Sequence, residues 1–143
     1  MTTASPDIEA LLATYLLAHD AVADLVGSRV GGRHPRAKGT PWVKVTQFSE
    51  ISLTKTLHVT QTDLQIECYG GSDLDEAQGE ASLIARTVRA ALNDMPESEH
   101  DGAVVSRVTF FGPRRVPDSD FDPARERFIL DASVTSHPTA AGS

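Results

Sequence analysis

The sequence predicts an α+β fold with one mainly antiparallel sheet and two helices packed on one face of it. Residues 8–16 and 74–95 repeat apolar side chains at three- and four-residue steps, as amphipathic helices do. Four other segments alternate apolar and polar residues with the period of a strand: 42–48, 59–69, 103–112 and 125–136. The resulting order of helix, strands, helix and strands is typical of a two-layer α+β domain.

The first helix is expected to have Pro6 at its first position and Ser5 as its cap, because serine accepts the free amides of a first turn. A short helical turn is then expected from Asp20 to Val26, stopped by Gly27. The apolar stripe of the first helix consists of Ile8, Leu11, Leu12, Tyr15 and Leu16.

Residues 27–41 are rich in Gly and Pro and are predicted to form a loop before the first strand, 42–48. That strand has two fairly apolar faces, so we expect it to be covered on both sides. Residues 49–58 are prone to β structure and lack a Gly or Pro turn signal. They predict an extended excursion or a long hairpin arm that leads into the strand at 59–69.

The stretch "DLQIECYGGSDLDEA", residues 63–77, changes from strand to helix. Gly70 and Gly71 allow a sharp turn, and Ser72 or Asp73 is expected to cap the helix that follows. Pro96 is expected to end that helix. Its small alanines predict close packing on the sheet. The full stripe comprises Leu74, Ala77, Ala81, Ile84, Ala85, Val88, Leu92 and Met95.

The segment between the last two strands, 113–124, contains three prolines and three aspartates and predicts an exposed loop. These elements together define a single expected domain, residues 1–136. Residues 137–143 are expected to form a flexible C-terminal tail.

Size and composition restrict the class of protein. A chain of 143 residues is long enough for one ordinary core. Its formal net charge of −7 disfavours general attraction to a phosphate backbone. Cys68 is the single cysteine, which excludes an intramolecular disulfide and agrees with a reducing compartment. No N-terminal leader is expected, and apolar stretches end well before the roughly 18 residues that would span a bilayer.

The residue patterns predict no catalytic, cofactor or metal site. The five histidines have no metal-ligand spacing. Cys68 lies on the apolar side of its strand and is interpreted as an inert core thiol. Acidic residues at 73–76 and 118–122 could in principle serve acid–base chemistry or bind a hard cation. We interpret them instead as a favourable helix N-terminus and a solvated loop.

Two basic stretches could form either a solvated surface or a contact between subunits. The denser one contains Arg33, Arg36 and Lys38, and the second contains Arg114 and Arg115. Neither has the interleaved aromatic residues of a platform for single-stranded nucleic acid. In an acidic protein, basic loops also suit contact with the acidic surface of a neighbouring copy.

The chain resembles the tail terminator (tail completion) proteins of long-tailed bacteriophages. The resemblance is carried by four passages: "DIEALLATYLLAHDAVADLVGSRV", "GTPWVKVTQF", "LQIECYGGSDLDEAQGEASLIARTVRAALN" and "RFILDASVTS". They cover nearly the whole chain as a pattern of elements and apolar positions, without an invariant motif.

The resemblance implies a structural protein with no catalysis and no cofactor. It implies a homo-hexameric ring that caps the tail tube, ends tube polymerisation and docks the head-tail connector protein. The expected partners are itself, the tail tube protein and the connector, with no sequence-specific nucleic acid and no membrane. The expected location is the head-proximal end of the virion tail, assembled in the host bacterial cytoplasm. An acidic bore would also let DNA slide through without sticking.

By element, the resemblance places subunit or tube contacts in the arm 49–58, in the loop 112–124 and in the basic stretches. The candidate interface residues are Arg33, Arg36, Lys38, Ile51, Leu53, Lys55, Leu57, Arg114, Arg115, Asp118 and Asp120. Two other functions remain open. One is a head completion or connector protein at the portal. The other is a small-ligand-binding module or soluble enzyme, which would need a pocket with convergent polar groups.

Overall fold

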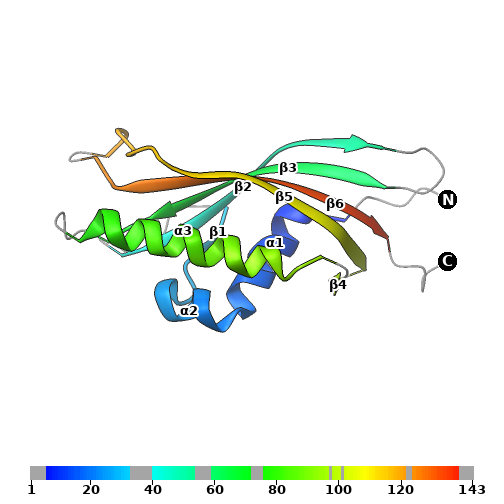
Figure 1. Ribbon diagram of the computed structural model, residues 1–143, viewed down its shortest axis with the longest axis horizontal. Coiled ribbons are helices and arrows are strands. Elements are labelled where there is room, and N and C mark those ends of the chain that lie inside the picture. Colours follow the sequence, from blue (N-terminus) through cyan, green and yellow to red (C-terminus); the bar gives the residue numbers. More distant parts are fainter. Residues whose placement is uncertain are drawn as a thin grey trace.

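A computed structural model describes residues 6–32, 40–53, 59–71, 76–96, 98–100, 102–121 and 124–138. One sheet forms the upper layer of the molecule, and the helices lie together on its lower side (Figure 1). The fold is therefore α+β, as the alternation of helical and strand periods predicted. No helix among the described residues is both long and apolar enough to cross a bilayer.

The described residues form three helices, one more than the two major helices predicted: α1 (Ile8–Ala18), α2 (Asp20–Val26) and α3 (Ala77–Asn93). Asp7 caps α1, since its Oδ1 accepts a hydrogen bond of 3.1 Å from the amide of Ala10. The cap is thus Asp7, and Ser5 lies outside the described residues. Gly27 ends α2 with a φ of 60°, which confirms its predicted role as a stop.

The sheet has six strands in the order β1-β2-β3-β6-β5-β4. β1 pairs in parallel with β2, and the other four pairings are antiparallel. The sheet is therefore mixed, which corrects the expectation of a mainly antiparallel one. The strand bounds are β1 (Val30–Gly31), β2 (Trp42–Ser52), β3 (Thr60–Tyr69), β4 (Ser98–His100), β5 (Ala103–Arg115) and β6 (Arg127–Pro138).

The two edge strands, β1 and β4, were not predicted. They contain two and three residues, too few for an alternating pattern to be read from sequence. β6 continues through His137 and Pro138, so the last strand takes in two residues that were expected in the tail. Residues 139–143 lie outside the described part of the chain.

The core lies between the helices and the lower face of the sheet. Buried side chains from all three helices and from the strands β2, β3, β5 and β6 form one cluster. Ala77, Ala81 and Ala85 of α3 are buried, with exposures of 2%, 0% and 0%. Their small size lets α3 lie close to the strands, as the thin stripe predicted.

The predicted turn between β3 and α3 includes a position that requires glycine. A Cβ built on Gly70 would lie 2.2 Å from the carbonyl oxygen of Ala77. Backbone atoms on both sides of the turn therefore approach too closely for any side chain. α3 itself begins at Ala77 rather than at Leu74. The predicted caps, Ser72 and Asp73, lie outside the described residues.

Cys68 is a core residue, in agreement with the sequence interpretation. Its exposure is 0%, and burial raises the pKa of the thiol far above its ordinary value. We predict that a thiol reagent modifies native Cys68 only as fast as the protein unfolds, because the reactive thiolate needs both solvent access and ionisation. Mass spectrometry after reaction in buffer and in denaturant would measure this. Rapid modification of the native chain would contradict the prediction.

Candidate interaction surfaces

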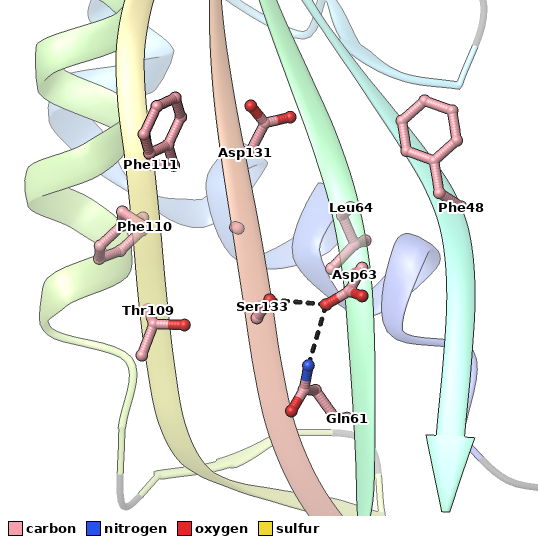
Figure 2. A pocket seen from close by; sticks show the side chains of 10 residues that line it. Phe48, Gln61, Asp63, Leu64, Thr109, Phe110, Phe111, Asp131 and Ser133 are labelled. Atoms are coloured by element: carbon pink, nitrogen blue, oxygen red, sulfur yellow. Dashed lines mark hydrogen bonds between the residues drawn. The ribbon is translucent and has the colours of Figure 1, made fainter.

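The upper side of the sheet, opposite the helices, has no covering layer among the described residues, and we call it the open face. Figure 2 looks onto it, with the helices behind the strands. Phe48 on β2 and Phe111 on β5 stand at its two sides, and Asp63 and Asp131 lie between them on the central strands β3 and β6. These residues border a shallow depression of about 300 Å³.

Asp63 is held in place by neighbouring side chains. The Ser133 hydroxyl donates to Oδ1 at 2.6 Å, the Gln61 amide donates to the same oxygen at 3.3 Å, and the Ser49 hydroxyl donates to Oδ2 at 3.1 Å. These hydrogen bonds lower the pKa of Asp63 below its usual value, and the bond from Ser133 makes the largest contribution. Across the described ranges, no cation forms an ion pair with this carboxylate. Among the described residues, Asp63 is therefore a fixed negative charge without a counter-charge.

Phe48 and Phe111 are exposed to 66% and 70%. The β2–β3 register shifts between Gln47 and Ser49, so Phe48 is the extra residue of a bulge. The expectation that both faces of this strand are covered is therefore wrong at Phe48. It holds at the other end of the strand, where Trp42 is 2% exposed. Strand alternation alone could not have found this difference, because a bulge shifts the alternation by one residue.

One end of the open face is closed by a buried polar cluster, which we define as Glu67, Tyr69, Asp118 and Arg127. The Tyr69 hydroxyl donates toward Asp118 Oδ2 at 2.8 Å and Glu67 Oε2 at 3.1 Å. Arg127 Nη1 lies 3.4 Å from Glu67 Oε1 and 3.6 Å from Asp118 Oδ2, and its Nε donates to the Val116 carbonyl at 2.8 Å. Burial, and then the bond to Asp118, raises the pKa of Tyr69 far above its usual value.

Arg125 links several neighbouring segments at the same end of the sheet. Its Nη2 donates to the carbonyls of Gly70 at 2.5 Å and Thr40 at 3.3 Å. Its guanidinium lies 4.7 Å from the centre of the Trp42 ring and 5.7 Å from that of Phe121. Asp118 and Arg125 also form an isolated bridge. The segment around them is therefore packed on the sheet and has a structural role.

The predicted interface residues separate into three groups. Ile51 and Leu53 lie at the end of the β2–β3 hairpin and are exposed to 51% and 49%. Arg114, Arg115 and Asp120 are also exposed. Asp118 is 5% exposed, so the prediction of an exposed loop is wrong there. Arg33, Arg36, Lys38, Lys55 and Leu57 lie outside the described residues.

Arg114 and Arg115 do not belong to a loop but to β5, opposite Ile129 and Phe128. Arg114 pairs with Asp131 at 2.6 Å, and Arg115 pairs with Glu126 at 2.7 Å. The strand continues past Pro113 because the register shifts between Phe111 and Arg114. The proline therefore falls in an irregular part of the pairing, where its missing amide costs no ladder bond.

The helical side carries a second candidate surface, of mixed apolar and charged residues, which the sequence did not predict. Leu83, Arg86, Thr87 and Ala90 follow the solvent side of α3 at helical spacing. Leu83 is exposed to 43%. With His19, Ala21, Ala91 and Asp94 these residues line a depression of about 330 Å³ between α3 and the start of α2. We call this the helical patch.

The described ranges contain no group of three or more His, Cys, Asp or Glu side chains that could hold a metal ion. The polar side chains of the open face bond mainly to one another, and those of the buried polar cluster are covered. The exposed side chains of Phe48 and Phe111 are available for contact with another molecule.

A family model described as "Tail completion protein gp17" matches residues 10–132. Among curated proteins, no relative matches the chain. The fold is similar to that of a chain in a solved structure titled "Virion of native gene transfer agent (GTA) particle". The TM-score is 0.64 at 18% identity, over 91% of this chain and 94% of that one. At this identity, the similarity to the solved structure establishes the fold alone.

Proposed function

The chain belongs to the family of the tail completion protein gp17, and from this premise we propose that it is a structural phage protein that caps the tail tube. In this proposal the protein forms a homo-oligomeric ring, a hexamer by resemblance, at the head-proximal end of the tail. The ring ends tube polymerisation and offers the surface on which the head connector docks.

The observation that carries the proposal is a pair of exposed apolar side chains, Ile51 and Leu53, at the end of the described part of the β2–β3 hairpin. The two strands reach past α1 and α3 at the right of Figure 1, and the amide of Leu53 donates to the Val59 carbonyl at 2.8 Å. Ile51 and Leu53 expose about half of their surfaces there. Apolar side chains on a braced hairpin are suited to insertion into a partner, because little conformational entropy remains to be lost on binding.

Deletion of the gene, followed by electron microscopy of the lysate, tests the proposal. We expect tails of uncontrolled length without attached heads. Normal tails beside leaking heads would contradict the capping role and would support a connector at the portal instead. Turnover of a substrate by the purified chain would contradict a purely structural role.

Introducing charge at the hairpin end is expected to weaken binding to the tail tube while leaving the fold intact. In the variant Ile51→Asp with Leu53→Asp, each apolar contact with the partner is replaced by a carboxylate that must lose its hydration. We expect binding to tail tubes, measured by co-sedimentation, to weaken at least about tenfold. Leu17→Asp is the matched control, since Leu17 is an exposed leucine of α1. Equal loss of tube binding in both variants would contradict a specific role for the hairpin.

A further inference from the structure

We infer that the open face of one subunit docks on the helical patch of a second copy, with Asp63 of one copy facing Arg86 of the other. Phe48 and Phe111 would flank this ion pair and contact Leu83 and Ala90 of the second copy. The inference rests on the proposed ring and assigns the two surfaces that would build it.

The Asp63 carboxylate on the open face is preorganised to bind a cation. Three side chains hold the Asp63 carboxylate in one orientation, and those hydrogen bonds favour its ionised form. The neighbouring Asp131 is already paired with Arg114, whereas Asp63 has no ion pair with any residue that the structure describes. A cation brought to it would meet an acceptor that needs no rearrangement, and preorganisation of this kind favours binding.

The aromatic side chains beside Asp63 indicate that the partner of the open face is a protein surface. Phe48 and Phe111 stand on either side of Asp63 and expose about two thirds of their surfaces. Large aromatic side chains around a single polar contact are typical of the centre of a protein interface. A nucleic acid is disfavoured, because the phosphate backbone would approach a fixed carboxylate.

The helical patch has the complementary features. Arg86 is exposed, and within the described part of the chain its one hydrogen bond, 3.3 Å from Nε to the Ser82 hydroxyl, is to an uncharged group. Leu83 is exposed beside it, and Ala90 leaves room in the depression for an aromatic ring. Asp94 lines the far end of the same depression, about two helical turns from Arg86.

The two surfaces lie on opposite sides of the molecule, since the open face is above the sheet and α3 is below it (Figure 1). A contact between opposite sides of identical subunits is heterologous. Such contacts repeat around a rotation axis and close into a ring when the rotation allows it. The placement therefore supports ring formation rather than a symmetric dimer.

A charge exchange tests the ion pair. In the purified full chain, with and without tail tubes of the same phage, we expect Asp63→Lys and Arg86→Glu each to lower subunit association at least tenfold, measured by analytical ultracentrifugation. The double exchange, D63K with R86E, is expected to restore most of it. Glu99→Lys, a charge reversal on the exposed edge strand β4, is the control and should leave association unchanged. Circular dichroism of every variant separates misfolding from lost contact.

A disulfide trap tests the surfaces without relying on charge. The double variant Phe111→Cys with Leu83→Cys is expected to give, on mild oxidation, a ladder of multiples of the 15.3 kDa chain. The buried Cys68 does not interfere. A dimer formed by Phe111→Cys alone would show that the open faces pair with each other and would overturn the inference.

The outcomes distinguish the inference from the proposed function. The inference is wrong if the double-cysteine chain forms no ladder, either free or on tubes. It is also wrong if the charge exchange fails to restore association. Either result would overturn the inference even if the wild-type chain still caps tubes. If the ladder forms but wild-type chain neither binds tubes nor limits their length, the subunit contact stands and the capping function fails.

Discussion

Replacement of Arg127 by Met should lower the free energy of unfolding by about 3–5 kcal/mol. Arg127 lies between Glu67 and Asp118, and its side chain is 16% exposed, against 12% and 7% for the two acidic side chains. Without the guanidinium, two carboxylates would share a largely buried site with no cation between them. Their mutual repulsion and their lost hydration would both act against folding. Urea denaturation followed by circular dichroism measures the difference.

The Arg115–Glu126 pair provides the matched control. It is another Arg–carboxylate pair near the start of β6, but the Arg115 side chain is 46% exposed, so solvent screens its charge. Arg115→Met should therefore leave the urea midpoint almost unchanged. Adding Asp118→Asn to Arg127→Met should recover part of the loss, because one of the two uncompensated charges is removed. An Arg127 variant as stable as the Arg115 variant would show that the buried polar cluster does not stabilise the fold.

The sequence predicted the elements whose apolar period extends over several turns or strand positions. The eight-residue stripe of α3 repeats often enough that no other structure fits it, and its described members are buried. Gly70 and Gly71 predicted the turn, and at Gly70 the backbone of Ala77 lies too close for any side chain. The β-prone stretch 49–58, which lacks a turn signal, predicted a hairpin arm. β2 continues to Ser52, in agreement, and residues 54–58 lie outside the described part of the chain.

Features that depend on distant parts of the chain could not be predicted. Asp118 is separated from Tyr69 by 49 positions, and nothing local distinguishes a buried aspartate from its exposed neighbour Asp120. The edge strands could not be predicted for another reason: β1 and β4 contain two and three residues, too few for an alternating pattern. The proline pattern predicts a loop from Pro113, because the irregular register that accommodates this proline is a property of the β5–β6 pair.

The candidate surfaces were predicted only in part. The exposed apolar residues Ile51 and Leu53 were identified from the arm. The open face was not, because the polar parity of β3 that includes Asp63 looks like any solvated sheet face. Its significance arises from Phe48 and Phe111, which come from strands on either side of the central pair. Sequence order gives no sign that these residues share a depression.

Adjacent residues of α3 allow the fold and the proposed contact to be tested separately. Ile84 is 0% exposed and belongs to the core cluster, whereas Leu83 is 43% exposed. Ile84→Ala removes buried apolar atoms and leaves a cavity, so it should lower the free energy of unfolding by about 2–5 kcal/mol. Leu83→Ala should change that free energy by less than about 0.5 kcal/mol.

In assembly we expect the opposite order: Leu83→Ala should have the larger effect and Ile84→Ala the smaller one. Leu83→Ala should weaken subunit association, because the helical patch loses the side chain that Phe48 and Phe111 would contact. Ile84→Ala should associate normally at temperatures where it remains folded, since its side chain faces the sheet. Thermal unfolding and ultracentrifugation of the same samples measure both properties. If Leu83→Ala assembled like wild type, the exposed side of α3 would not be a subunit contact. If Leu83→Ala unfolded as readily as Ile84→Ala, Leu83 would contribute to the core despite its exposure. Core and contact residues of α3 could then not be distinguished by their exposure.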